Sequence, residues 1–402
     1  MNRARNAGRL AILALSALAI VPMTGGVAEA KARKGVPVKV MTRNVYLGAD
    51  LTRAFNATGF HEFIEANGQI LRDVDATNFP LRSQALGDEI LRKRPDLVGL
   101  QEVALWRLGP VAVPPTISGQ PFGAVNVKYD FLQLLLGQLE GKYKVAVVQE
   151  EFDFEAPADY NDVDNDAPAG SFAQEDPAVN DEGPNSTDDA EVNGRLTMRD
   201  VILVRKGGRA KVRNPQGGQF ENLLEVSVAG LPVTVQRGWT AVDVKAQKGR
   251  GDKRQRTRFR FVNTHLEAFD DETQNPSIRS QQARELYAPD GPADKKRVVL
   301  LGDLNSDDDT VQPADQQAYR ALVEGGFRER STANPLSCCL NDPLLRAAGP
   351  GSLADFDHQV DHVMTNMKRK AKLLSSSVTG LAAVNGLWPS DHAGVFSKLR
   401  IR

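Results

Sequence analysis

The chain has 402 residues with 50 Lys and Arg against 51 Asp and Glu, and this near-neutral balance singles out no charged partner. Its two cysteines, Cys338 and Cys339, are adjacent, which excludes a protein built on a disulfide framework. A bridge between them and two unpaired thiols both remain open. The absence of C-x-x-C and H-E-x-x-H patterns disfavours a zinc site.

The first 30 residues have the pattern of a secretory signal peptide. Three arginines precede an apolar run at 10–23, which is short for a membrane span, and Ala28-Glu29-Ala30 forms an A-x-A cleavage site. We therefore expect cleavage after Ala30 and a secreted, extracellular protein. The remaining residues, 31–402, would carry a net charge of about −3 and suffice for one large domain or two ordinary ones.

Polar groups follow the first two predicted strands. Partial alternation from Val36 predicts a strand that ends at Asn44, and helical spacing predicts helices over 55–71 and 81–91. A buried strand over 95–101 then leads to Glu102. A turn former at Asn44 and a solvated carboxylate at Glu102 are the simpler interpretations. The repeated arrangement, a strand followed by a group that can bind metal, favours a functional role for both.

An acidic segment interrupts the next part of the chain. It follows a predicted helix over 131–139 and a strand over 143–148, and residues 150–191 hold fifteen acidic residues and no Lys or Arg. Such a composition predicts an exposed, mobile insertion at about 150–192. Its Asp162-Val163-Asp164-Asn165-Asp166 run resembles a calcium loop but lacks the Gly and Glu that an EF-hand needs, which disfavours calcium binding.

A basic hairpin follows. Strands are predicted over 195–205, 233–244 and 257–264, and the last two are joined by a loop rich in Lys and Arg, so that residues 245–260 form a basic patch. This patch could hold substrate phosphates or be a solvated hairpin tip. The last strand leads to His265, one of only five histidines. A histidine there is either structural or part of a site.

The clearest active-site signal is Gly302-Asp303-Leu304-Asn305, which follows the apolar run 298–301 and a predicted helix over 277–286. In an extended chain Asp303 and Asn305 would face the same way. A carboxylate and an amide side by side suit a hard divalent cation and a phosphoryl oxygen. A turn that caps a core strand is the simpler alternative.

Two acid–histidine pairs close the chain. After a predicted helix over 313–325, the strand 357–364 places Asp361 on one face and His358 and His362 on the other. Asp391 and His392 then lie in a loop before the last strand.

Six motifs, taken in chain order, resemble the endonuclease/exonuclease/phosphatase superfamily over residues 36–402. They are Asn44, Leu-Gln-Glu102, Asn-Thr-His265-Leu, Gly-Asp303-Leu-Asn305, Val-Asp361-His-Val and Ser-Asp391-His392. The resemblance implies one catalytic domain, residues 31–402. Its fold would be a four-layered α/β sandwich, two mixed β-sheets packed face to face with helices outside and the site at one edge.

The resemblance also implies roles. Glu102 would ligate Mg²⁺, with Asn44 binding metal or phosphate and Asp391 completing the metal or hydrogen-bond network. Mn²⁺ or Ca²⁺ could substitute. His392, polarised by Asp361, would activate water or hold the scissile phosphate. Asp303 and Asn305 would orient the nucleophile and phosphoryl oxygens, and His265 would stabilise developing charge or protonate the leaving oxygen.

The expected function is a secreted, divalent-metal-dependent phosphoester hydrolase, with a nuclease as one form of it. A lipid phosphodiesterase of the sphingomyelinase type and a catalytically silent binding protein on the same fold are the alternatives. The substrate would be a phosphoester, with nucleic acid and phospholipid both open. No obligate protein partner is evident, and we expect a monomer. The number of metal ions is left open.

Overall fold

The computed structural model describes residues 34–113, 115–161, 190–270, 274–308, 316–331, 336–340, 356 and 358–402. The expected signal peptide and the run 162–166 lie outside these ranges, so both remain sequence predictions. Within the ranges, no helix combines the length and apolarity that a membrane span requires.

The larger sheet is organised around β1 (Val36–Asn44) and β2 (Leu97–Gln101). These two strands pair in parallel with Asn44 opposite Gln101, so both deliver their polar ends to the same edge. The sheet has eight strands, in the order β15 (Ala371–Thr379), β16 (Gly394–Ile401), β1, β2, β6 (Val192–Arg205), β3 (Leu105–Gly109) and β4 (Asn126–Asp130), and β5 (Tyr143–Ala158) also pairs with β6.

The second sheet brings three predicted site residues onto neighbouring strands. Its six strands run in the order β13 (Arg328–Glu329), β14 (Asp361–Thr365), β12 (Val298–Asp303), β11 (Gln255–His265), β10 (Gly238–Lys248) and β7 (Ala210–Gln219). Asp303 lies opposite His265 on one side and opposite Asp361 on the other. A separate pair, β8 (Leu224–Val228) and β9 (Leu231–Val235), forms a two-stranded sheet.

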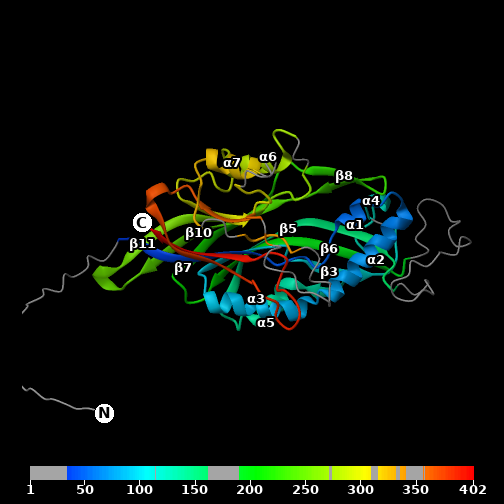
Figure 1. Ribbon diagram of the computed structural model, residues 1–402, viewed down its shortest axis with the longest axis horizontal. Helices are drawn as coiled ribbons and strands as arrows, with labels where there is room; N and C mark the ends of the chain where they lie inside the picture. Colours follow the sequence, from blue (N-terminus) through cyan, green and yellow to red (C-terminus); the bar gives the residue numbers. More distant parts are fainter. Residues whose placement is uncertain are drawn as a thin grey trace, which may run out of the picture. The chain divides into compact units, whose positions relative to one another are not determined.

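Helices cover the outer faces of the two sheets (Figure 1). Apolar side chains such as Val38 and Leu97 from the larger sheet meet Phe261 and Val299 from the second, which forms the inner core. The outer face of the larger sheet packs against α2 (Phe60–Ala76), α3 (Phe79–Lys93) and α5 (Phe131–Gln138), and that of the second sheet against α6 (Ile278–Tyr287) and α7 (Gln317–Glu324). The expected four-layered α/β sandwich is confirmed.

The remaining elements are short. They are α1 (Thr52–Phe55), α4 (Pro115–Ser118) and the 3₁₀ turns Gly251–Lys253 and Lys368–Lys370. The predicted helix over 55–71 was wrong at its start, because the chain leaves α1 and begins α2 only after Gly59. There the backbone N–H and hydroxyl of Thr58 both donate to the Glu62 carboxylate, which fixes the new helix start.

The strand β5 extends into the segment expected to be an insertion. Residues 150–158 are strand rather than loop, because Phe152 and Phe154 pack against the apolar core under α2 while the acidic residues alternate with them. The high acid content hid this period of two. The rest of the expected insertion, 162–189, lies outside the described residues.

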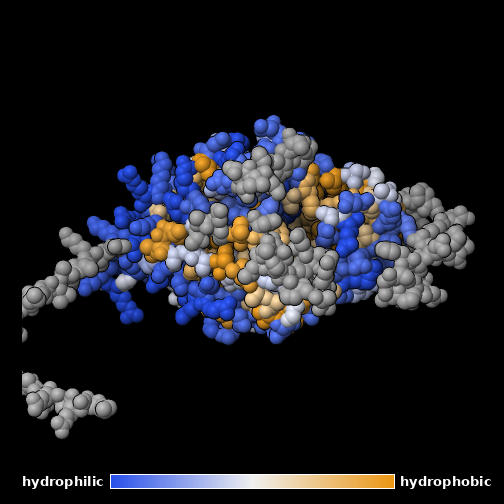
Figure 2. Space-filling model, in the orientation of Figure 1, coloured by the Kyte–Doolittle hydropathy of each residue, from blue (hydrophilic) through white to orange (hydrophobic). Residues whose placement is uncertain are grey.

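The basic hairpin points away from the polar strand ends. β10 and β11 pair from Gly238 opposite His265 to Lys248 opposite Gln255, so the tip lies about 33 Å from His265 at roughly 3.3 Å per residue. Its lysines and arginines are largely exposed, and Figure 2 shows hydrophilic side chains over this end of the molecule. The structure therefore favours the solvated tip over a patch that holds substrate phosphates at the site.

Candidate active site

Asn44, at the end of β1, joins the two sheets. Its side chain is buried, and Nδ2 donates to Oε1 of Glu102 at 2.8 Å and to Oδ2 of Asp303 at 3.0 Å. Its Oδ1 accepts from the backbone N–H of Tyr46 at 2.9 Å, which fixes the orientation of the amide. Asn44 is therefore a polar group at the centre of a cluster and more than a turn former.

Glu102 follows β2 directly and turns back towards β1. Its backbone has a φ of 57°, in the left-handed region that non-glycine residues rarely adopt. Oε2 accepts from the backbone N–H of Leu47 at 2.8 Å. Burial and the nearby charge of Asp391 raise the pKa of Glu102, although its hydrogen bond from Asn44 works in the opposite direction. The simple interpretation of a solvated strand end is wrong here.

Asp303 ends β12 and is 1% exposed. Gly302 precedes it with a φ of 149°, and a Cβ there would lie 1.9 Å from the carbonyl oxygen of Thr264, so only glycine fits. Oδ1 of Asp303 accepts from the backbone N–H of Asn305 at 3.0 Å. Burial and the neighbouring Asp361 raise the pKa of Asp303.

Asn305 is held differently from the expectation. The chain from Asp303 is not extended, because Asn305 has a φ of 46°. Its Nδ2 donates to the carbonyl oxygen of Leu266 at 3.0 Å and ties the loop after β12 to the loop after β11. Asp303 and Asn305 therefore do not form the predicted extended i, i+2 pair, and the turn that caps the strand is present alongside the polar cluster.

His265 ends β11 and is 1% exposed. Arg237 Nη1 lies 3.2 Å from Nδ1 of His265, and because a guanidinium only donates, Nδ1 accepts and the ring proton is on Nε2. Nε2 lies 3.8 Å from Oδ2 of Asp303 and 4.0 Å from Oε1 of Glu102. Burial, with the positive charge of Arg237, lowers the pKa of His265 well below its usual value.

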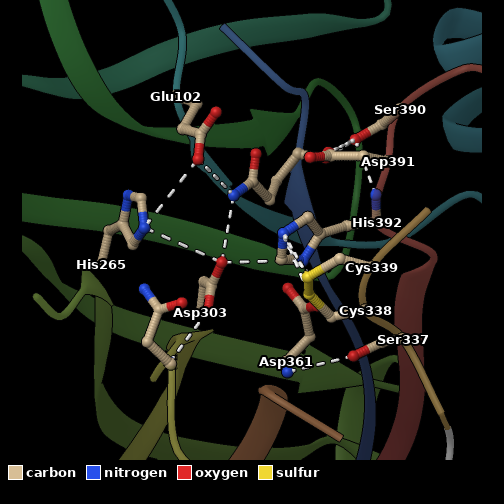
Figure 3. Close-up of a disulfide and its surroundings, with 12 residues drawn as sticks. Glu102, His265, Asp303, Ser337, Cys338, Cys339, Asp361, Ser390, Asp391 and His392 are labelled. Carbon is tan, nitrogen blue, oxygen red and sulfur yellow. Dashed lines mark hydrogen bonds and ion pairs between the residues drawn. A yellow bond between two sulfur atoms is a disulfide. The ribbon is translucent and has the colours of Figure 1, made fainter. Parts of the chain in front are cut away.

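His392 has the opposite environment. Its Nδ1 lies 2.9 Å from Oδ2 of Asp361 and 3.6 Å from Oδ2 of Asp303 (Figure 3). Burial opposes the charge of His392, but the carboxylates around it, Asp361 first, outweigh this and raise its pKa well above its usual value. The ring therefore favours the protonated state, with Nδ1–H donating to Asp361.

The loop that carries His392 is tied to β1. Ser390 Oγ donates to the carbonyl oxygen of Asn44 at 2.9 Å and accepts from the backbone N–H of His392 at 3.2 Å. Asp391 lies between them in the chain and lines a neighbouring cleft together with Glu102.

This cleft, of about 350 Å³, opens beside Glu102 and Asp391. Arg237 lies on one side, and apolar side chains including Phe55, Phe152 and Phe269 form much of the remaining wall. Two carboxylates at a cleft, one with its pKa raised partly by the charge of the other, are an arrangement that a divalent cation with oxygen ligands would neutralise. The carboxylates of Glu102 and Asp391 therefore fit a hard cation, and Asn44, whose Nδ2 donates to Glu102, holds one of them in place.

Three charged residues beside His265 were not among the predicted site residues. Glu151, Asp200 and His265 form a buried group whose ligand atoms lie within 4.8 Å of one another. Burial raises the pKa of Glu151 to about 8. Asp200 is an acidic residue inside the predicted strand 195–205, directly before its apolar run 201–204, which was a usable signal. Arg237, in contrast, lies inside what the sequence presents as one continuous strand over 233–244. The structure divides that strand into β9 and β10 at this residue.

The two cysteines also lie at the site. A disulfide joins Cys338 and Cys339, which decides between the two states that the sequence left open. Their Sγ atoms lie 3.7 Å and 3.9 Å from Nε2 of His392.

The predicted residues therefore converge. Asn44, Glu102, His265, Asp303, Asp361 and His392 form one connected group, to which Asn305 is joined through its backbone and Asp391 through the loop of His392.

Comparisons with known proteins show the family of the chain. The family model described as the endonuclease/exonuclease/phosphatase family matches residues 44–392. A search of curated proteins gives no match. Among solved structures, a protein of that family from Bacteroides thetaiotaomicron is 12% identical with a TM-score of 0.51, covering 92% of this chain and 100% of that one. The B. thetaiotaomicron mannosyl-6-phosphatase Bt3783 is 14% identical with a TM-score of 0.47, covering 90% and 99%. The chain belongs to the endonuclease/exonuclease/phosphatase family, whose members are phosphoester hydrolases.

Proposed function

We propose that the protein is a secreted, divalent-metal-dependent hydrolase that directs water onto a phosphodiester or phosphomonoester. The observation that carries this proposal is the meeting of Asn44, Glu102, Asp303 and two histidines with opposite pKa shifts beside an open cleft. A binding protein has no need of this combination of buried, mutually repelling carboxylates. Secretion rests on the N-terminal sequence pattern alone.

Glu102 and Asp391 would hold the cation, with Asn44 keeping Glu102 in place. The cation is Mg²⁺ in our proposal, with Mn²⁺ or Ca²⁺ able to substitute. When bound, the cation supplies charge neutralisation for the phosphoryl oxygens. The carboxylate oxygens at this position suit hard cations rather than zinc.

The two histidines have different roles in the proposed mechanism. His392, whose Nδ1–H is held by Asp361, would contact a negatively charged phosphate oxygen through Nε2. His265, which is neutral with its proton on Nε2, would donate a hydrogen bond to the developing charge or to the leaving oxygen. Asp303, whose pKa is raised, would orient the attacking water and accept its proton.

The cleft favours substrates with an apolar part. Its wall contains Phe55 and Phe152, and both also line an adjoining, almost entirely apolar pocket. The basic patch that would attract a long polyanion lies at the distant hairpin tip. A lipid phosphodiesterase is therefore a second candidate beside a nuclease.

The test uses the purified protein with Mg²⁺, with and without chelator, against plasmid DNA, RNA, sphingomyelin and bis-p-nitrophenyl phosphate. We expect chelator-sensitive cleavage of at least one substrate. His392→Ala and Asp303→Ala should each lower that rate by about 10³-fold or more, because each removes a group that contacts the reacting atoms.

Asp96→Asn is the matched control. Asp96 is also fully buried and pairs with Arg205 at 2.7 Å, but it lies before the opposite end of β2 from Glu102. Near wild-type turnover in either active-site variant would contradict the proposed roles. Absence of hydrolysis on all four substrates would favour a catalytically silent binding protein or a narrow phosphomonoesterase.

A further inference from the structure

The side chains at Nε2 of His392 belong to a segment far away in sequence. Because Nδ1 is bonded to Asp361, Nε2 is the ring nitrogen left to meet another group. The atoms found there are the Sγ atoms of Cys338 and Cys339, at 3.7 Å and 3.9 Å (Figure 3). Two sulfurs and one imidazole nitrogen therefore converge on one point.

The backbone holds this segment in place on both sides. Cys338 and His358 exchange backbone hydrogen bonds of 3.1 Å and 3.0 Å. On the other side, the N–H of Leu340 donates to the carbonyl oxygen of Asp391 at 2.9 Å, and that of Ala393 to Ser337 at 2.7 Å. The position of the sulfurs relative to His392 is thus set by the same loops that position the catalytic group.

The spacing matches the ligands of a tetrahedral soft-metal site. With metal–sulfur and metal–nitrogen bonds of about 2.3 Å and 2.05 Å, the sulfur and nitrogen ligands of a zinc ion lie about 3.6 Å apart. The two Sγ–Nε2 distances are close to this value. Two thiolates and an imidazole are the donors that zinc and cadmium prefer, and Mg²⁺ does not compete for them.

We propose that Cys338 and Cys339, once reduced, form with His392 a binding site for a thiophilic divalent cation such as Zn²⁺ or Cd²⁺. A dithiol supplies the two electrons and two protons that convert the disulfide into two thiols, and is itself oxidised to a cyclic disulfide. Binding of the cation then releases three protons to solvent, one from each thiol and one from Nε2 of the protonated His392 ring. With the S–S bond gone, the sulfurs can separate to the roughly 3.8 Å that tetrahedral ligands require.

The structure provides an entry path and a fourth position. Cys338 is buried, but Cys339 is the more exposed of the two, so solvent reaches the pair from its side. Three protein ligands leave one position for water. A cation at this site occupies Nε2 of His392, and if the proposed hydrolase function holds, it inhibits hydrolysis by withdrawing that group from the substrate.

Cadmium binding gives a readout that does not depend on activity. The protein is reduced with a dithiol, desalted without oxygen and titrated with Cd²⁺, while the ultraviolet sulfur-to-cadmium charge-transfer band is recorded. Because the chain contains only these two cysteines, the band reports on this site alone. We expect two titratable thiols after reduction, saturation at one equivalent of Cd²⁺, displacement by Zn²⁺, and no band without reduction.

Variants test the contribution of each proposed ligand to Cd²⁺ binding. Cys338→Ser with Cys339→Ser should abolish the band, and alkylation of the reduced wild-type thiols should do the same without any substitution. His392→Ala should weaken Cd²⁺ binding by about 100-fold. This is the upper end of the loss in metal affinity when a group that supports a ligand is removed, and His392 is itself a ligand. Unchanged affinity in His392→Ala would overturn the proposal, as would no band in the reduced wild type or no thiols after native reduction. Zinc inhibition of the reduced enzyme, relative to its rate without zinc, tests the consequence separately.

Discussion

Replacing Asp361 by Asn tests how His392 is prepared for catalysis. Asp361 is fully buried, and its Oδ2 lies 2.9 Å from Nδ1 of His392. An asparagine keeps the size of the side chain but removes the negative charge, and its amide can equally present N–H to the ring. His392 then loses both the charge that raises its pKa and the acceptor that fixes its tautomer. Asp361 acts through His392 and is therefore a positioning residue.

The structure sets the size of the effect. A hydrogen bond to a charged group contributes about 1.5–3 kcal/mol, which corresponds to a rate loss of roughly 10- to 150-fold. A fraction of rings in the wrong tautomer adds to this loss, so we expect kcat to fall by about 10²-fold or somewhat more. The pH at which His392 titrates in the rate profile should move down, because its largest favourable charge is gone.

The assay is the pH dependence of kcat and kcat/KM for Asp361→Asn, His392→Ala and the double variant, with Asp96→Asn as control. If Asp361 works through His392, the double variant loses little more than His392→Ala alone. Asp96→Asn removes a buried carboxylate distant from the site and should leave the pH profile in place. Losses that multiply in the double variant, or an unshifted profile in Asp361→Asn, would refute the reasoning.

Two further predictions concern the metal and a buried ion pair. Chelation should stop hydrolysis, and Mg²⁺ or Mn²⁺ should restore it. In a metal titration, Glu102→Gln should raise the Mg²⁺ concentration that gives the half-maximal rate by about 10- to 100-fold. Rescue by Zn²⁺ alone would contradict the oxygen-rich site. The other prediction concerns the ion pair of His362 and Glu329, in which Nδ1 of His362 lies 2.7 Å from Oε2 of Glu329. Although burial opposes the charge of His362, the carboxylate raises the pKa of His362, and the pKa of Glu329 is lowered. Because a raised histidine pKa stabilises the fold below about pH 6.5 and loses this effect as pH rises through the folded value, His362→Gln should lower Tm more at pH 6 than at pH 9. An equal fall in Tm at both pH values in thermal melts would show that the ion pair contributes nothing.

The positions of the polar strand ends could be predicted because strand period and order are local signals. Apolar runs before Asn44, Glu102 and Asp303 mark the strands. Parallel pairing places the ends of β1 and β2 side by side in the larger sheet and those of β11 and β12 side by side in the second. The faces of β14 also followed from alternation, since Asp361 enters the site while His362 bonds to the carbonyl oxygen of Ser306 at 2.9 Å.

What the sequence did not predict depends on contacts between distant segments. Nothing local marks Arg237, because it becomes a site residue only where β9 ends and β10 begins, beside His265 from another strand. Composition misled at Glu151, whose acidic neighbours suggested a loop although Phe152 and Phe154 alternate as a strand should. The cysteines lie 53 and 54 residues before His392, so no motif spacing could connect them to it.

The two histidines illustrate why residue types alone do not assign roles. In the sequence, His265 and His392 are both histidines next to a strand boundary with acidic residues nearby. In the structure, Arg237 meets Nδ1 of one ring and a carboxylate meets Nδ1 of the other, so one pKa is lowered and the other raised. Across the shared carboxylate of Asp303, the site therefore offers a neutral N–H donor on one side and a cationic one on the other. In the proposed mechanism, that asymmetry would orient a phosphoryl group, with its most negative oxygen towards His392 and its leaving oxygen towards His265.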